Sequence, residues 1–390
     1  MSLPRRVGIL ILLITFMHVN GQGTGAPFQL SGYITNMQSV IFRDLNKEWV
    51  EDNLIHNRIN LFWYPAANIT ATLQMRNRLI YGETMKYTPG YANRIAGDGG
   101  LADLSVNLFT GDSYLLNATI DRLWLQATAG KFVFTAGRQR INWGQNLVWN
   151  PNDVFNVYSY FDFDYEERPG SDALRVQYYP NMTTTAELAV KADSSGKVTA
   201  AGLYRFNRWN YDIQLLGGVL NGEDVVSGLG FSGNLGGAAL RGELTLFRSL
   251  DQFSDTSAYV MTSLGMDYSF GNALMVQFEF LYSGLPADLQ GFDEFYSEPL
   301  SVKKLAFTKY SVFAAVNYPI SPLLQGSLAG MYFPGIDGYF AGPSLSYNLK
   351  DNVDLGLFVQ HFNGNIKLPG SMAKTKEKLT LAFLRFRWNF

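Results

Sequence analysis

Three features of this 390-residue chain predict an all-β fold, a transmembrane antiparallel up-and-down β-barrel of about 18 strands, with 16 as the alternative count. Apolar residues occupy every second position in segments that recur along the chain. The connections between these segments are of two kinds, tight turns and longer polar loops. The chain contains 28 Phe, 22 Tyr, 7 Trp and 38 Gly, yet its mean hydropathy is only −0.03, as expected when every second strand residue is polar.

The first residues predict a signal peptide. Arg5 and Arg6 precede an apolar stretch over residues 7–19, and small residues that offer a cleavage site follow it. We therefore expect residues 1–21 to be a signal peptide and residues 22–390 to form the barrel. No later apolar run reaches about 18 residues, which argues against a helical membrane protein. The chain has no cysteine, so it has no lipoprotein anchor and no disulfide framework.

The first three strands are expected over residues 28–42, 54–64 and 68–82. Alternation is clearest in the third, where Leu73, Met75 and Leu79 share one face and Gln74, Arg76 and Arg78 share the other. Such a period of two is incompatible with a helix. The same pattern continues through the remaining strands to the last residue.

The connections are sorted by parity. Tight turns follow the even-numbered strands, as at residues 65–67, 128–130 and 270–272. The long loops follow odd-numbered strands and cover residues 42–53, 83–114, 141–172, 249–257, 285–306 and 364–377. Short periplasmic turns and long extracellular loops are the asymmetry expected of an outer-membrane barrel. An even strand count also places both termini on the periplasmic side.

The final strand separates its two faces completely. Leu384, Phe386, Trp388 and Phe390 lie on one face, whereas Arg385, Arg387 and Asn389 lie on the other. This ending resembles the last strand of bacterial outer-membrane β-barrels. The resemblance implies that Phe390 is an assembly signal read by the barrel assembly machinery. It also implies an outer-membrane location, with lipid and lipopolysaccharide as partners.

The polar faces of the strands should point into the lumen, because hydrocarbon does not solvate charge. Their charges fall into two arcs, one mainly basic and the other mainly acidic. The basic arc holds Arg58, Arg76, Arg78, Arg122 and Arg175, and it continues across the seam to Arg385 and Arg387. The acidic arc includes Glu187, Glu243 and Glu279. Such arcs would either set a field across the pore or merely keep the interior wet.

One strand breaks the parity. Phe132, Phe134, Arg138 and Arg140 all fall on the same face, and the two arginines cannot face lipid together with the two phenylalanines. A β-bulge near Gly137 would reconcile them.

Residues 141–171 form the richest loop, because about 30 residues without a strand pattern are unusual and often functional. Its position resembles the third loop of general bacterial porins, which folds into the barrel. Gly137-Arg138-Gln139 and Trp143-Gly144 also resemble segments of the alginate-export and related porin-like families. These resemblances imply that the loop enters and narrows the lumen. The alternative is an external cap held by pairs of arginine and carboxylate.

The loop is rich in aromatic and acidic residues. Trp143, Trp149, Tyr158 and Tyr160 would either stack on sugar faces or pack the loop against the wall. Its carboxylates could meet the basic arc in a constriction, and they are Asp162, Asp164, Glu166 and Glu167. Asp162, Asp164 and Glu166 lack the glycine and the distal glutamate of a calcium loop, so we expect no metal.

Other chemistry finds little support. His56 and His361 are the histidines of the mature chain. An outer-membrane phospholipase would need Ser, His and Asn together on an exterior face, and although His361 lies near Asn363 and Ser344 could be its neighbour, no spacing singles this set out. No spacing of cysteine or histidine suggests a metal or cofactor. The net charge of −2 argues against nucleic-acid binding. We therefore expect neither an enzyme nor a nucleic-acid-binding protein.

These observations favour a porin-like channel for passive diffusion of small polar or charged solutes. The expected pore-lining and constriction residues are Arg58, Arg76, Arg78, Arg122, Arg138, Arg140, Arg175, Arg385, Arg387, Asp162, Asp164, Glu166 and Glu167. The alternative is a non-conducting outer-membrane receptor, adhesin or secretion-complex component that presents its extracellular loops. A homo-oligomer fits either function, and alternation alone does not locate its interface.

Overall fold

The computed structural model describes residues 27–47, 49–251, 253–254, 258–286, 291–292, 301–367 and 373–390. The expected signal peptide, residues 1–21, lies outside these ranges. No helix in the described ranges is long and apolar enough to cross a membrane.

The described residues form 19 strands and a few short helices. The strands are β1 (Phe28–Phe42), β2 (Val50–Ala66), β3 (Ile69–Gly82), β4 (Ser105–Thr110), β5 (Tyr114–Ala129), β6 (Phe132–Gln139), β7 (Ser171–Asn181), β8 (Thr184–Ala192), β9 (Val198–Arg208), β10 (Tyr211–Leu220), β11 (Asp224–Leu235), β12 (Ala238–Ser249), β13 (Tyr259–Ser269), β14 (Met275–Ser283), β15 (Tyr310–Pro319), β16 (Leu324–Phe333), β17 (Gly338–Lys350), β18 (Val353–Ile366) and β19 (Thr375–Asn389). The helices are α2 (Glu83–Tyr87), α3 (Tyr91–Ala96), η1 (Val302–Lys304) and η2 (Pro334–Ile336).

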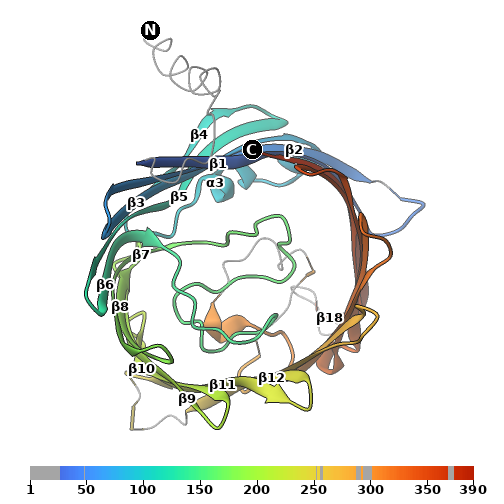
Figure 1. The fold of residues 1–390 in the computed structure, drawn as a ribbon. Helices are drawn as coiled ribbons and strands as arrows, with labels where there is room; N and C mark the ends of the chain where they lie inside the picture. Colours follow the sequence, from blue (N-terminus) through green and yellow to red (C-terminus); the bar gives the residue numbers. More distant parts are fainter. Residues whose placement is uncertain are drawn as a thin grey trace.

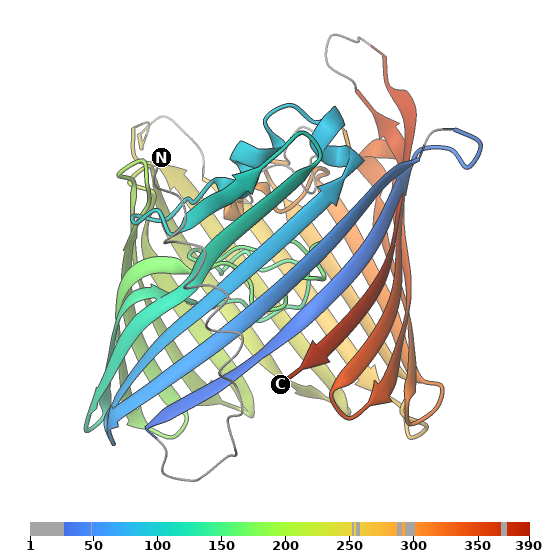
Figure 2. The ribbon, with the colours of Figure 1, turned by 90° about the horizontal axis from the view of Figure 1, so that it is seen from above.

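Eighteen of these strands close into an antiparallel barrel, because β1 pairs with both β2 and β19 (Figure 1). At the seam, the backbone N–H groups of Gly32 and Phe390 each donate 2.9 Å hydrogen bonds to the other residue's carbonyl. The predicted count of 18 is confirmed. The strands are strongly tilted, with tight turns at one end and longer connections at the other (Figure 2). We call these the short-turn end and the long-loop end.

The predicted alternation of outward apolar and inward charged side chains in the last strand, β19, is present in the structure. Leu384, Phe386 and Trp388 face outward and are 42–48% exposed, whereas Arg385 and Arg387 form ion pairs inside the barrel. Exposed Leu, Val, Phe and Tyr side chains continue around the other strands. An apolar outer band on a closed barrel is suited to a bilayer. The predicted outer-membrane β-barrel fold is confirmed.

The loop expected over residues 83–114 contains regular structure. It forms α2, α3 and β4, and β4 pairs with the part of β5 near the long-loop end. That part of β5 lacks its other neighbour because β6 is only 8 residues long. The loop therefore supplies a short strand where β6 has left the wall.

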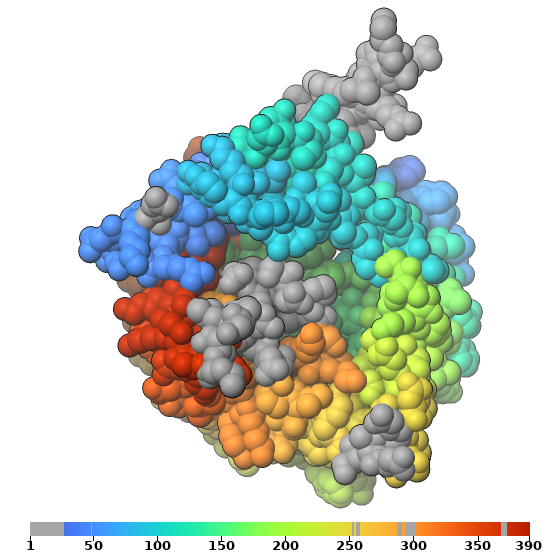
Figure 3. Space-filling view, turned by 180° about the vertical axis from the view of Figure 1, so that it is seen from behind, coloured from blue at the N-terminus to red at the C-terminus, as the bar shows by residue number. Residues whose placement is uncertain are grey.

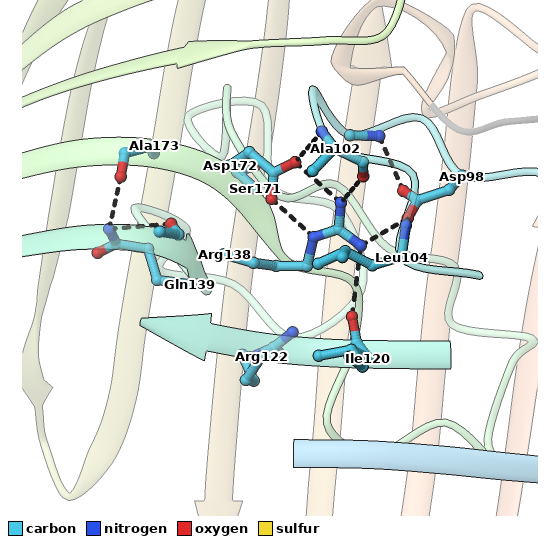
Figure 4. Close-up of polar contacts among 12 residues, drawn as sticks. Asp98, Ala102, Leu104, Ile120, Arg122, Arg138, Gln139, Ser171, Asp172 and Ala173 are labelled. Carbon is cyan, nitrogen blue, oxygen red and sulfur yellow. Dashed lines mark hydrogen bonds and ion pairs between the residues drawn. The ribbon is translucent and has the colours of Figure 1, made fainter. Parts of the chain in front are cut away.

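Arg138 holds this part of the wall together (Figure 4). All its guanidinium nitrogens donate, to the Asp172 carboxylate at 2.7 and 2.8 Å, to Asp98 at 2.6 Å, and to the carbonyls of Ala102 and Ile120 at 2.7 and 3.3 Å. Its side chain is only 6% exposed. The Arg138 cluster (Arg138, Asp98, Asp172, Ala102 and Ile120) thus joins β6, β7, β5 and the 98–104 segment.

The bulge expected near Gly137 is not where the prediction put it. β6 keeps a continuous register with both β5 and β7. Arg138 remains on the outward parity but is covered by the 98–104 segment, which explains how its charge is tolerated. The register shifts instead between β3 and β5, where Asp121 is the extra residue and turns inward together with Arg122. Gly137 adopts φ +113°, and a Cβ there would lie 2.2 Å from the Leu123 carbonyl oxygen.

Candidate functional site

The loop between β6 and β7, residues 140–170, lies inside the barrel (Figure 1). It crosses to β12 and β14, runs past β15, β17 and β18, and returns beside β2, β3 and β19 to the start of β7. It has no regular secondary structure, yet Ile141 and Trp143 are at most 1% exposed. The hydrophobic core of the described residues therefore joins this loop, the inner wall and residues of the connection between β14 and β15, such as Val302 and Ala306.

The first half of the loop, residues 141–153, is held through its backbone by two glutamates of the wall. Glu243 on β12 accepts N–H bonds from Gln145, Asn146 and Asn152 at 2.5–3.0 Å. Glu279 on β14 accepts bonds from three consecutive N–H groups, those of residues 147–149, at 2.6–3.2 Å. Both glutamates are 2% exposed. Six loop N–H groups that would otherwise be buried without partners are satisfied by ionisable acceptors, which make strong hydrogen bonds.

Side chains reinforce this first half. The Trp143 Nε1–H donates to Glu187 of β8 at 2.6 Å, and Gln214 of β10 donates to the Trp143 carbonyl at 2.7 Å. Trp149 is 5% exposed. Both loop tryptophans are buried in the protein rather than presented to a solute.

The middle of the loop packs by aromatic contact. Tyr160 meets Phe313 and Phe340 edge-on, with ring centroids 5.1 and 6.4 Å apart. Phe161 meets Phe340 and Phe362, each at 5.1 Å. Such edge-to-face pairs stabilise packing beyond the area they bury. Of the two expectations for the loop aromatics, packing against the wall describes Trp143, Trp149 and Tyr160. Tyr158 donates to the Leu147 carbonyl and lies under the Arg168 guanidinium.

The second half of the loop, residues 162–168, is held by charged side chains. Asp164 lies 3.1 Å from His56 Nε2, 3.2 Å from Arg76 and 3.9 Å from Arg385. Glu166 pairs with Arg387 at 2.7 Å and with Arg385 at 3.6 Å. Glu167 lies 3.5 Å from Arg58 and accepts a hydrogen bond from the Tyr33 hydroxyl at 3.2 Å. The loop carboxylates therefore meet the basic arc, on β2, β3 and β19.

The loop carboxylates Asp164 and Asp162 differ in their charged neighbours and in their exposure. Burial opposes the ionisation of Asp164, but the hydrogen bond from His56 and the nearby arginines outweigh it, so the pKa of Asp164 is lowered. The side chain of Asp162 instead faces the open lumen, and it has no ion pair within 4 Å among the described residues. Asp162 is thus the loop carboxylate most available to a passing solute.

The remaining predicted arginines contribute in different ways. Arg122 donates to the carbonyls of Glu167 and Arg168, each at 2.7 Å, and so fixes the return of the loop. Arg175 pairs with Glu187 at 2.7 Å. Arg78 donates to the carbonyl of Ile95 and to Asn117 and keeps part of its surface open. The buried Nε of Arg140 has no hydrogen-bond partner in the ranges that the structure describes.

Two of the spaces between the loop and the wall are lined by described residues of both. The larger, about 960 Å³, is bordered by Arg76, Arg78 and Asp162 and reaches the connections of the long-loop end at Asp98 and Asp193. Figure 3 shows this mouth hollowed beside the cyan 83–110 segment. The smaller, about 370 Å³, lies between the loop and β16–β18. The residues that border both spaces, which we call the shared rim, are Tyr158, Ser159, Asp162, Phe163, Tyr165 and Arg168.

Several contributors were not singled out from the sequence. Glu243 and Glu279 were expected to face inward, but their contacts with loop N–H groups were not expected. His56, Asp121 and Arg168 also belong to the network. A mid-strand inward glutamate without an arginine opposite it is the available signal, because such a charge needs other donors. Among the described residues, no group of three or more His, Cys, Asp or Glu could hold a metal ion.

Comparison with known proteins adds the fold and no more. No family model and no curated protein matches the chain. OccAB2 of Acinetobacter baumannii superposes with a TM-score of 0.57 at 10% identity, over 93% of this chain and 98% of that one. OccK11 (OpdR) of Pseudomonas aeruginosa gives 0.56 at 11%, over 93% and 96%. The chain has the fold of these Occ barrels. Its expected likeness to bacterial porin-like barrels is therefore confirmed for the fold, while identities near 10% carry no Occ activity over to it.

Proposed function

We propose that this protein is an outer-membrane channel for passive diffusion of small polar or charged solutes, narrowed by the loop of residues 140–170. We also propose that residues 1–21 are its signal peptide. The observation that carries the proposal is the shared rim. A solute that passes from the larger space to the smaller one must pass these residues, and five of the six carry a charged or hydroxyl group.

The charges beside the rim give the channel a mechanism. Asp162 faces the lumen from the loop, and Arg78 borders the same space from β3. Fixed charges in a narrow, low-dielectric passage act strongly on ions, because few waters screen them. Arg76, Arg385 and Arg387 are neutralised by loop carboxylates, so we assign them to the positioning of the loop. Arg78 and Asp162 are the groups we expect to tune selectivity.

Conductance in planar bilayers tests the proposal. We expect discrete channels and, for Arg78→Glu, a shift of the reversal potential toward cation preference in a salt gradient. Arg208→Glu is the matched control, since Arg208 is exposed at the end of β9. A folded protein that never conducts would overturn the channel. It would favour the receptor, adhesin or secretion-component alternative, above all if a large partner co-purified.

A further inference from the structure

Five carboxamide side chains lie on the lipid-facing parity of β1, β2 and β3. The set, which we call the amide patch, is Asn36, Gln38, Asn53, Asn57 and Asn77. The register fixes their direction. Asn36 and Gln38 lie opposite the outward Phe386 and Leu384 of β19, and Asn57 lies directly opposite Asn77. Residues opposite each other in an antiparallel pair share one face of the sheet.

The amide patch lies at the height of the hydrocarbon. Stacked rings mark both ends of this part of the wall, Phe28 with Trp63 near the short-turn end and Phe42 with Trp49 near the long-loop end. Aromatic girdles mark the two interfaces of an outer-membrane barrel. Asn36 lies eight residues from Phe28 and six from Phe42 along β1. At ~3.3 Å per residue and a tilt of ~40°, it is roughly 15–20 Å from either girdle.

The rest of the wall is different at this height. Outward positions in the middle of other strands carry side chains such as Leu188, Leu229, Phe278 and Leu328, which are 44–66% exposed. Lipid tails offer no hydrogen bonds, and a carboxamide without partners costs free energy in hydrocarbon. A cluster of five on three adjacent strands therefore calls for a specific partner.

Pairing within the chain satisfies only part of the amide patch. Asn36 donates to Asn53 at 3.2 Å, and Asn77 donates to Asn57 at 2.9 Å. The Asn53 Nδ2 and the Asn77 Oδ1 are buried, so a second molecule does not reach them, and neither has a hydrogen-bond partner among the described residues. The Asn36 Oδ1 and the Asn57 Nδ2 are not buried and have no hydrogen bond to the described residues either. Gln38 is exposed, and its side chain has no hydrogen bond to the described residues. Donors and acceptors both remain unused.

We infer that a second copy of this chain packs against β1–β3 through the amide patch. A carboxamide both donates and accepts, so the patch is complementary to itself and two copies can satisfy each other's groups. Polar side chains that hydrogen-bond across an interface stabilise association within a membrane. The inference does not depend on whether the barrel conducts.

The absence of cysteine from the chain allows a direct test. In Gln38→Cys and Asn57→Cys, oxidation of outer membranes should produce a cross-linked species of twice the chain mass. Leu229→Cys, outward on β11, is the matched control and should cross-link at least tenfold less. No cross-link at either patch position, equal cross-linking at Leu229→Cys, or cross-links to a different protein would each overturn the inference.

A second experiment measures assembly without cysteine. Native mass spectrometry of the detergent-extracted wild type should give an oligomer. Asn36→Leu, Gln38→Leu, Asn57→Leu and Asn77→Leu combined should raise its dissociation constant at least tenfold, while heat-modifiable migration on gels verifies the barrel. Ser227→Leu, an outward polar position on β11, should leave assembly unchanged. A monomeric wild type, or a quadruple variant that assembles normally, would contradict the inference.

Discussion

The loop of residues 140–170, which we call the lumen loop, is held in two ways that reverse the roles of loop and wall. In residues 141–153 the loop supplies backbone N–H groups and the wall supplies Glu243 and Glu279 as acceptors. In residues 162–168 the loop supplies carboxylates and the wall supplies arginines. The backbone of the first half therefore depends on two wall residues, while its own side chains, such as Trp143, add further bonds to the wall. The second half depends on side chains of both partners, which also carry the charges of the passage.

The largest effect is expected from the wall glutamates of the first half. Combining Glu243→Ala with Glu279→Ala removes the acceptors of six buried N–H groups, each costing about 1–3 kcal/mol if left without a partner. We expect the loop to leave its position, so that single-channel conductance rises several-fold.

The control for this change is Glu223→Ala, which removes an exposed carboxylate paired with Lys197 at the long-loop end. Glu243→Gln combined with Glu279→Gln retains one acceptor oxygen at each position and should have an intermediate effect. Wild-type conductance in the double Ala variant would mean that the first half is held by its packing instead.

An intermediate effect is expected from Asp164→Asn in the second half. The change leaves Arg76, His56 and Arg385 without their shared carboxylate, and breaking a buried ion pair typically costs about 3–5 kcal/mol. We expect a lower melting temperature together with a shift toward anion preference in the reversal potential.

Asp162→Asn is the matched control, because it removes the same charge from a side chain without an ion pair among the described residues. It should shift selectivity in the same direction while stability stays near that of the wild type. Equal melting temperatures for the two variants would contradict the role assigned to Asp164.

The smallest effect is expected on the pH dependence of stability, through Asp153 in the first half of the lumen loop. Burial raises the pKa of Asp153 to about 7, and its Oδ2 has no hydrogen-bond partner within the described part of the chain. The folded state therefore holds the proton more tightly than the unfolded chain, so stability from this group is lost as pH rises from about 4 to 7. The melting temperature of Asp153→Asn should fall less than that of the wild type between pH 5 and pH 8. If the melting temperatures of the variant and the wild type changed equally with pH, Asp153 would not be the group responsible.

The sequence was sufficient for features governed by local periodicity. Alternation in strands such as residues 68–82 identified which side chains face lipid, and the sorting of connections fixed the strand count. It was insufficient where distant segments meet. Nothing near Glu279 indicates that it accepts bonds from residues 147–149, since the two are some 130 residues apart. β4 and the register shift at Asp121 were missed for the same reason. Each compensates for the early end of β6, which lies in a different segment of the chain.

The early end of β6 links two properties of the barrel that look independent. The residues that follow Gln139 cross the interior instead of extending β6. The same residues that narrow the passage therefore leave a gap in the wall beside β5. β4 covers this gap by pairing with β5, and the Arg138 cluster fixes the 98–104 segment that precedes β4 to the wall. A variant that shortened the lumen loop enough to restore a full-length β6 would have to expel β4. The width of the passage and the integrity of its side wall are therefore set by the same stretch of chain.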